Sequence, residues 1–237
     1  MSNDRLMRQP KVVAFDADDT LWDCQGHFDR VMQWLYDELV PWTDRETSAQ
    51  ELFATERRNM ALLGYGTKAF TLSMIETALR VSRHQITADR IEALLRECYS
   101  LLALPATPLP EVLTTLQTLQ QHDTVMVLFT KGELLDQQHK LERSGLAHFF
   151  SHVEITSDKT EREFSDLCHK LGIAPADLLM VGNSLKSDIA PALAIGAQAV
   201  HIPFHITWEL EHAEGFCHPR LLCITRFSQL LGCLGIP

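Results

Sequence analysis

The sequence predicts an α/β fold, in which helices cover both faces of a parallel sheet and an all-helical block is inserted after the first strand. Two patterns support this prediction. Beyond the proline-rich segment 104–110, short apolar runs alternate with segments of helical spacing, whereas residues 23–105 show helical spacing alone. We therefore predict an α/β core of residues 1–22 and 106–237, and a helical domain of residues 23–105.

The first strand is predicted at residues 11–16, because the run Val12–Phe15 is short, apolar and rich in β-branched side chains. Three carboxylates end it: Asp16, Asp18 and Asp19. Such close like charges repel each other, and Mg²⁺ among their oxygens would relieve the repulsion. A carboxylate fixed at a strand end can also act as a nucleophile. Taken alone, the segment is explained equally well as an acidic turn.

Four helices are predicted in the inserted block, near residues 27–39, 44–62, 68–81 and 87–103. The fourth shows the pattern most clearly, with apolar side chains at intervals of three and four residues from Ile91 to Leu102. The tripeptide Gly64-Tyr65-Gly66 separates the second helix from the third, because glycine breaks helices.

After the prolines, strands and helices alternate, which indicates right-handed βαβ units in a parallel sheet. The further strands are predicted at 125–129, 152–156, 178–181 and 199–202. The helices that accompany them are predicted near 110–121, 133–144, 160–171 and 186–195. Ligands bind beyond the carboxyl ends of the strands in such sheets, so the residues that follow each strand are the candidate functional residues.

Two of these strand ends carry residues that suit an anionic ligand. Thr130 and Lys131 precede a helix, where a hydroxyl and the first backbone N–H groups can bind an anion, although Thr130 can also simply cap the helix. Lys159 follows the next strand and could neutralise phosphoryl oxygens, or it could be a solvated loop lysine.

The strand at 178–181 ends in a third polar segment. Gly182 allows a close approach of the backbone, Asn183 offers an amide oxygen, and Asp188 returns a carboxylate shortly afterwards. A helix start rich in capping residues explains this segment about as well. The stretch 201–208 follows the last predicted strand and is expected to line the edge of the site.

Together these segments resemble the motifs of the haloacid dehalogenase-like (HAD-like) hydrolase superfamily, over nearly the whole chain. The residues that match its four motifs in order are Asp16, Asp18 and Thr20, then Thr130, then Lys159, then Gly182–Asp188. The helical block resembles the cap of the subfamily that includes phosphoglycolate phosphatases. The resemblance implies a Rossmann-like core with strand order 5-4-1-2-3 and a cap domain.

The resemblance implies a Mg²⁺-dependent phosphatase of a small phosphorylated metabolite. Asp16 would attack phosphorus and form an aspartyl-phosphate, and Asp18 would act as general acid and base. Thr130 and Lys159 would hold the phosphoryl oxygens. The implied metal ligands are Asp16, Asp18 through its backbone carbonyl, Asn183 and Asp188.

Substrate choice is expected in the cap, which would close over the core and present its own side chains. Tyr65 and Lys68 are predicted to bind substrate because they lie at the glycine-flanked break between helices. Lys131, beside Thr130, is predicted to bind substrate from the core.

Two residues depart from the family pattern. Asn183 stands where the family usually has aspartate, so one negative charge is missing and Asp188 becomes the more important acid. Asp19 stands where many relatives have glycine, and the sequence assigns it no role.

Other functions stay open. A phosphoglucomutase-like phosphoryl transfer would use the same residues. Haloacid dehalogenases share the nucleophile and the lysine but lack the second aspartate, so Asp18 argues against that reaction. Asn183 leaves open a non-catalytic protein that binds a phosphorylated metabolite.

The composition of the chain limits the classes of binding partner that we expect. The chain of 237 residues has 31 acidic and 21 basic residues and a formal net charge of −10, which disfavours nucleic acid. It contains neither a run of about 18 apolar residues nor an apolar leader, so we expect no membrane partner and a cytoplasmic location. Its six cysteines show no CxxC spacing and are expected to be buried free thiols. The oligomeric state is not predicted.

Overall fold

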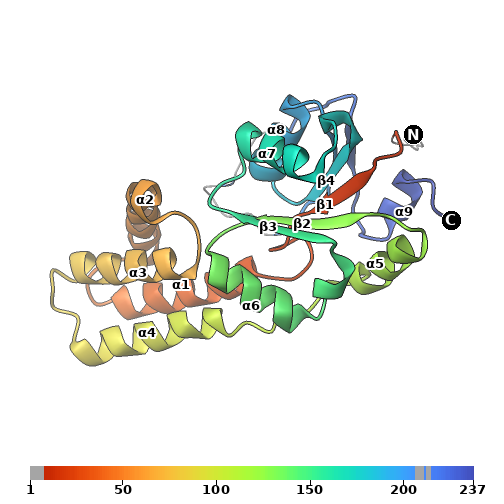
Figure 1. The fold of residues 1–237 in the computed structure, drawn as a ribbon. Coiled ribbons are helices and arrows are strands. Elements are labelled where there is room, and N and C mark those ends of the chain that lie inside the picture. The colour runs from red at the N-terminus through yellow and green to blue at the C-terminus, as the bar shows by residue number, and fades with distance from the viewer. Residues whose placement is uncertain (1–7, 206–210, 212–214) are drawn as a thin grey trace.

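The computed structural model describes residues 8–205, 211 and 215–237. It consists of a twisted sheet with helices on both faces and a helical block beside it (Figure 1). All strand pairs are parallel, in the order β3-β2-β1-β4-β5-β6. The strands are β1 Val12–Phe15, β2 Met126–Lys131, β3 His152–Thr156, β4 Leu178–Gly182, β5 Gln198–His201 and β6 Leu221–Cys223. The predicted α/β fold and the order of its five strands are thus confirmed.

The strand β6 was not predicted. It is a three-residue edge strand that pairs with β5, and its leucines are only half-buried. The apolar run 221–224 is too short for its sequence alone to distinguish a strand from other structure. A second difference lies after β4. A single helix was predicted near 186–195, but the chain forms a π-helical turn, Leu185–Ile189, followed by the short helix α8, Ala190–Ala194.

The side chains of β1 point alternately to the two faces of the sheet and all are buried, as expected of a strand in the interior of the sheet. Val13 and Phe15 pack into the hydrophobic cluster on one face, and Val12 and Ala14 into the cluster on the other. The helices α5 and α9 cover the first face, to which α6 contributes Leu141, and α7 and α8 cover the second (Figure 1). These helices are α5 Val112–Gln121, α6 Leu134–Ser144, α7 Glu161–Leu171 and α9 Gln229–Cys233.

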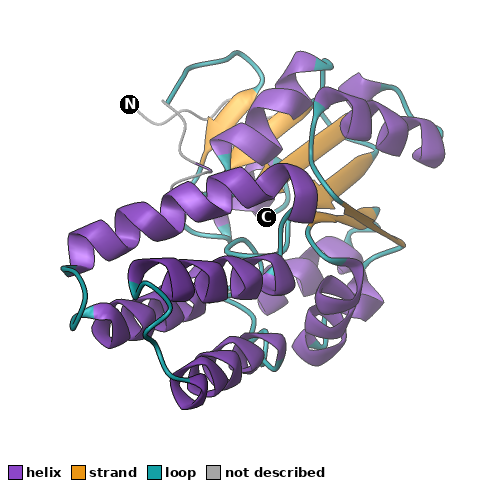
Figure 2. Ribbon diagram, turned by 90° about the vertical axis from the view of Figure 1, so that its left-hand side faces the viewer, coloured by secondary structure: helices purple, strands orange, loops and turns teal. Residues whose placement is uncertain are grey.

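The helical block has its own hydrophobic cluster, separate from those of the sheet. Its helices are α1 Gln25–Leu39, α2 Arg45–Leu63, α3 Thr67–Val81 and α4 Ala88–Leu102, close to the predicted positions. Figure 2 shows this block, which contains only helices, next to the strands of the sheet. The division of the chain into residues 1–22 with 106–237 and residues 23–105 remains a prediction, with which the separate cluster agrees.

The two segments that join the block to the sheet run side by side. Trp22 and Pro108 form an isolated antiparallel bridge, and the backbone N–H of Leu109 donates to the carbonyl of Leu21 at 2.8 Å. The Trp22 ring is fully buried in the cluster on the first face of the sheet. Both ends of the block are therefore anchored at one place.

Two further expectations concerned membrane-spanning segments and the cysteines. No helix in the described part of the chain is long and apolar enough to cross a membrane. All six cysteines are free, as expected, but Cys217 and Cys223 are exposed, which corrects the expectation that all are buried.

Candidate active site

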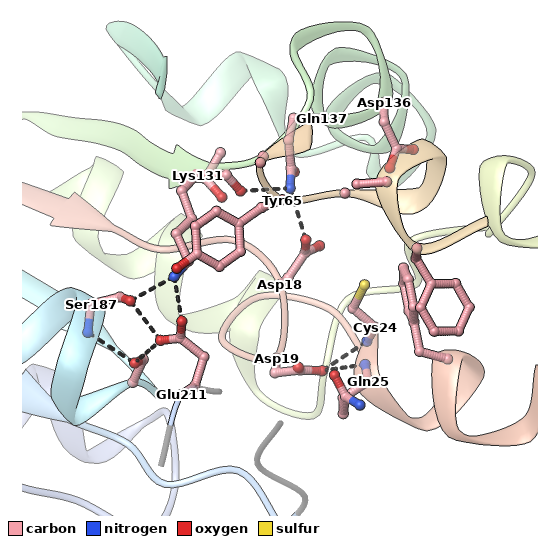
Figure 3. Close-up of a pocket in the computed structure, with 18 of the residues that line it drawn as sticks. Asp18, Asp19, Cys24, Gln25, Tyr65, Lys131, Asp136, Gln137, Ser187 and Glu211 are labelled. Carbon is pink, nitrogen blue, oxygen red and sulfur yellow. Dashed lines mark hydrogen bonds and ion pairs between the residues drawn. The ribbon is translucent and has the colours of Figure 1, made fainter. Parts of the chain in front are cut away.

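A cavity of about 170 Å³ lies between the carboxyl ends of the strands and the helical block. Its lining combines residues that follow β1, β2 and β4 with residues of α1, α2, α3 and α6 (Figure 3). Eight of the nine predicted site residues line it: Asp16, Asp18, Tyr65, Thr130, Lys131, Lys159, Asn183 and Asp188. The ninth, Lys68, is not part of this lining. It is largely exposed and forms an ion pair with Glu133 at 3.1 Å.

Asp16 and Asp188 face each other across the ammonium group of Lys159. The Lys159 Nζ donates to Asp16 Oδ1 at 2.5 Å and to Asp188 Oδ1 at 2.7 Å. Burial and the charge of Asp188 raise the pKa of Asp16 to about 7, against the lowering effect of Lys159. Burial by itself would lower the pKa of Lys159, but the two carboxylates outweigh it and raise that pKa. Lys159 is therefore a fixed positive charge beside Asp16.

Asp188 reaches this position because the chain turns sharply after β4. It lies on the π-helical turn, and its Oδ2 accepts the backbone N–H of Ser184 at 2.9 Å. A Cβ atom on Gly182 would lie 2.3 Å from the same Oδ2, so only glycine leaves room for the carboxylate here. The close approach expected at Gly182 is thus to the protein's own Asp188.

Two threonines and an amide complete this end of the cavity. The Thr20 hydroxyl lies 3.0 Å from Asp16 Oδ2 and 3.1 Å from Asn183 Oδ1, and it accepts the backbone N–H of Asn183 at 3.1 Å. Thr130, on β2, is buried and lines the cavity. Thr20 therefore connects the segment after β1 to the segment after β4.

Asp18 is held by residues of α6 that the sequence analysis did not identify. Lys140 Nζ lies 2.8 and 2.7 Å from its two oxygens, and Gln137 Nε2 donates at 2.8 Å. The indole N–H of Trp22 donates to the same carboxylate at 2.7 Å. Burial alone would raise the pKa of Asp18, but Lys140 and these hydrogen bonds outweigh it and lower that pKa. Lys140 and Gln137 look like ordinary polar residues of an amphipathic helix, and only their burial identifies them.

Asp19 has a structural role. Its backbone adopts a left-handed φ of 61°, which glycine adopts without strain and which aspartate tolerates better than most residues. Its Oδ1 accepts the backbone N–H groups of Cys24 and Gln25 at 2.8 and 2.9 Å, at the start of α1 (Figure 3). Burial raises the pKa of Asp19 to about 7, although these hydrogen bonds oppose the shift. Asp19 thus fixes the turn between the sheet and the helical block.

Lys131 is held in a second polar cluster, at the side of the cavity that faces Tyr65 (Figure 3). Its ammonium group lies 3.8 Å from the centre of the Tyr65 ring and donates to Ser187 Oγ at 2.7 Å. It also donates to Glu211 Oε1 at 2.5 Å. The other carboxylate oxygen of Glu211 accepts the hydroxyls of Ser184 and Ser187 at 2.7 and 2.5 Å.

Glu211 is another lining residue that the sequence analysis missed. Burial alone would raise the pKa of Glu211, but Lys131 and the two serines outweigh it and lower that pKa, so the side chain is ionised. Burial and the charge of Glu211 raise the pKa of Tyr65 to about 12. The edge of the site was expected at residues 201–208. Of these, 206–208 lie outside the described residues, and Glu211 lies beyond them in the sequence.

The oxygen atoms around Asp16 suit magnesium. Within the part of the chain that the structure describes, no three His, Cys, Asp or Glu side chains form a metal-binding group. Asp16 and Asp188 nevertheless provide two carboxylates and Asn183 an amide oxygen, and Mg²⁺ commonly takes its remaining ligands from water and phosphate. Burial, together with the neighbouring charge of Asp188, raises the pKa of Asp16, and a divalent cation bound beside it would favour the ionised carboxylate. The donor set therefore fits Mg²⁺.

Comparisons with known proteins agree with this arrangement. Residues 10–196 match the sequence profile of a family described as haloacid dehalogenase-like hydrolase. A glyceraldehyde 3-phosphate phosphatase of Methanothermobacter thermautotrophicus is 28% identical over 218 residues, which cover 86% of this chain and 91% of that protein. A phosphoglycolate phosphatase of Vibrio cholerae is also 28% identical over 218 residues, 88% of this chain and 89% of its own.

A solved structure resembles the whole chain. A haloacid dehalogenase-like family hydrolase from Xanthomonas campestris superposes with a TM-score of 0.84 at 30% sequence identity. The superposition covers 94% of this chain and 92% of the other. The similarity therefore extends over the sheet and the helical block alike.

Proposed function

Since this chain belongs to the haloacid dehalogenase-like hydrolase family and is a phosphatase of that family, we propose that it hydrolyses the phosphate ester of a small metabolite through an aspartyl-phosphate on Asp16. One observation above all supports this proposal. The carboxylate of Asp16 lies at the end of the central strand, in a cavity, with the buried cation Lys159 at 2.5 Å. A nucleophile, a charge to stabilise the transferred phosphoryl group and a space for the substrate thus occur together.

The reaction would take place in two steps. A carboxylate oxygen of Asp16 attacks phosphorus, the bond to the ester oxygen breaks, and Asp18 gives a proton to the departing alkoxide. Asp18 then takes a proton from water, whose oxygen attacks the phosphorus of the aspartyl-phosphate, so that phosphate leaves and Asp16 is restored. The contacts of Asp18 with Lys140, Gln137 and Trp22 lower its pKa and so favour the ionised form that takes the proton from water in the second step. In the first step the negative charge of the bound phosphate would act against them and favour the protonated form.

The phosphoryl oxygens would be bound by Thr130 and Lys159, since both line the cavity around Asp16. Asp16, Asp188, Asn183 and the backbone carbonyl of Asp18 are the proposed ligands of Mg²⁺. When bound there, Mg²⁺ supplies positive charge to the phosphoryl oxygens and lowers the repulsion between them and the nucleophile. Lys131 and Tyr65 are proposed to contact the organic part of the substrate. For Lys68 the ion pair with Glu133 offers no support for such a contact.

The decisive experiment compares phosphate release by the wild type, Asp16→Asn and Asp123→Asn. Each would be assayed on a panel of phosphorylated metabolites, with Mg²⁺ and with a chelator. We expect Mg²⁺-dependent release by the wild type and a loss of about 10³-fold or more in Asp16→Asn, because the nucleophile is removed. Asp123 is exposed and far from the cavity lining, so its variant controls for the lost charge.

Two outcomes would contradict the proposal. Phosphate release that survives in Asp16→Asn would exclude an intermediate on this residue. The absence of release from every ester, with full binding of the same esters, would instead favour a binding protein.

A further inference from the structure

We propose that the substrate carries no second anionic group beside its phosphate, and that the cavity selects hydroxyl- or carbonyl-bearing monophosphates against phosphorylated carboxylates. This inference rests on the proposed phosphatase function and specifies its substrate class. It is drawn from the charges that line the cavity.

Every cation in the described lining is already paired with a carboxylate of the protein. Lys159 lies against Asp16 and Asp188, and Lys140 lies against both oxygens of Asp18. The third cation of the described lining, Lys131, pairs with Glu211. A second anionic group would therefore find no cation whose charge is not already neutralised.

The lining as a whole contains more acidic side chains than basic ones. Seven acidic residues line the cavity against three lysines, and they are Asp16, Asp18, Asp19, Glu56, Asp136, Asp188 and Glu211. Lys159 and the proposed Mg²⁺ would serve the phosphate itself. Beyond them an added carboxylate would be repelled, because like charges brought together in a partly desolvated site raise the free energy of binding.

The pair Lys131–Glu211 is the most informative part of this arrangement. Lys131 follows Thr130 and contacts Tyr65, so it lies between the phosphoryl end of the cavity and the helical block. This is where a lysine could bind a substrate carboxylate. Glu211 supplies a carboxylate there instead, and both side chains are largely buried, with 14% and 12% of their surface exposed. A competing anion would have to separate this pair and leave Glu211 uncompensated, which is unfavourable.

The side of the cavity formed by the helical block suits a neutral organic group. Beside the acidic Glu56, it combines apolar side chains with neutral polar ones, namely Phe28, Met60, Phe70, Gln25, Asn59 and Ser73. The rings of Phe28 and Phe70 pack edge to face, with their centres 4.9 Å apart. Carbon–hydrogen faces can pack on these rings while hydroxyl or carbonyl groups meet the amides and the hydroxyl.

A matched pair of esters tests the inference on the wild-type protein. Glyceraldehyde 3-phosphate and 3-phosphoglycerate differ only in an aldehyde against a carboxylate. We expect kcat/KM to favour the aldehyde by about tenfold or more, with the same sign for glycerol 3-phosphate against 3-phosphoglycerate. Equal or better hydrolysis of 3-phosphoglycerate would overturn the inference while leaving the phosphatase function intact. No Mg²⁺-dependent release from any ester would overturn the function itself.

A charge-neutralising variant tests the role of Glu211. Glu211→Gln should release Lys131 for the substrate carboxylate, so the preference for the aldehyde over the carboxylate should shrink by about tenfold. Glu142→Gln removes an equal charge from the exposed face of α6, outside the cavity lining, and should leave the ratio of the two kcat/KM values unchanged. An unchanged ratio in Glu211→Gln would overturn the assignment of Glu211. If this variant does not fold, the wild-type ratio still decides the inference.

Discussion

At the scale of single residues, Asp19 holds the turn between the sheet and the helical block. The sequence analysis places Asp19 in the acidic cluster but assigns it no role, because sequence shows neither its left-handed backbone nor its hydrogen bonds to Cys24 and Gln25. Lys140 and Glu211 were missed for a related reason. Their importance comes from burial against Asp18 and Lys131, and long-range pairs of this kind leave no local pattern.

Two substitutions of Asp19 test how much this residue stabilises the turn. Asp19→Ala should lower the free energy of unfolding by about 2 kcal/mol, since it removes the acceptor at the start of α1 and alanine tolerates the left-handed conformation less well than aspartate. Asp19→Asn keeps the acceptor and tolerates that conformation, so it should lose much less. Chemical denaturation measures both, and equal losses would show that the hydrogen bonds do not stabilise the turn.

The wild type and Asp19→Asn should also differ in how their free energy of unfolding depends on pH. The pKa of Asp19 is raised from 3.8 to about 7 in the folded protein. Between these values the folded state keeps a proton that the unfolded state has released, so this group makes stability fall as pH rises. Asp19→Asn cannot titrate, and its stability relative to the wild type should therefore rise between about pH 4 and pH 7 in metal-free buffer. A constant difference across this range would contradict the shift.

At the scale of elements, sequence predicts what is regular and misses what is irregular. β1, β2 and β4 were predictable because buried parallel strands are mostly continuous apolar runs. β3 and β5 are interrupted by polar side chains and were predictable from their place in the alternation of strands and helices. The four helices of the inserted block were predictable from their spacing of apolar residues. The π-helical turn after β4 was not, because it depends on a carboxylate that folds back against Gly182.

Gly182→Ala tests this turn. The new methyl group would lie within 2.3 Å of Asp188 Oδ2, so the carboxylate and its turn must move. We expect a loss of about 1–3 kcal/mol in the free energy of unfolding, together with a marked drop in phosphate release, because Asp188 would leave Lys159. Gly232→Ala on α9 is the matched control, since nothing lies within 4 Å of a Cβ atom there. Wild-type activity in Gly182→Ala would show that the position of Asp188 is not critical.

At the scale of the whole molecule, the cavity exists because two parts of the chain meet, and specific polar contacts join them. Lys131 of the sheet lies against Tyr65 of the helical block, and the hydroxyl of Thr67 on α3 donates to Asp136 Oδ2 on α6 at 3.0 Å. Both partners of this hydrogen bond are buried. Sequence predicts that the block presents residues to the site, but it does not predict which side chains form the contact.

Thr67→Val tests this contact between the two parts. Among the described residues, Asp136 Oδ1 has no hydrogen-bond partner, and loss of the Thr67 donor would leave Oδ2 with only the distant ammonium of Lys140 at 3.9 Å. The free energy of unfolding should fall by about 1–3 kcal/mol, as is typical for a buried acceptor that loses its partner. Thr114→Val, at an exposed position on α5, should change it by less than about 0.5 kcal/mol. Equal effects of both variants would mean that the contact does not hold the block.

The paired connections at Trp22 and Pro108 have a consequence for how such a protein can be rebuilt. Because Leu21 and Leu109 are joined by a backbone hydrogen bond of 2.8 Å, we expect that the helical block, the proposed source of substrate selection, can be exchanged between relatives through two adjacent splice points. No strand of the sheet is interrupted by such a graft, since β1 ends before the first splice point and β2 begins after the second. A chimaera made in this way should keep Asp16, the proposed nucleophile, in place while it acquires a new specificity.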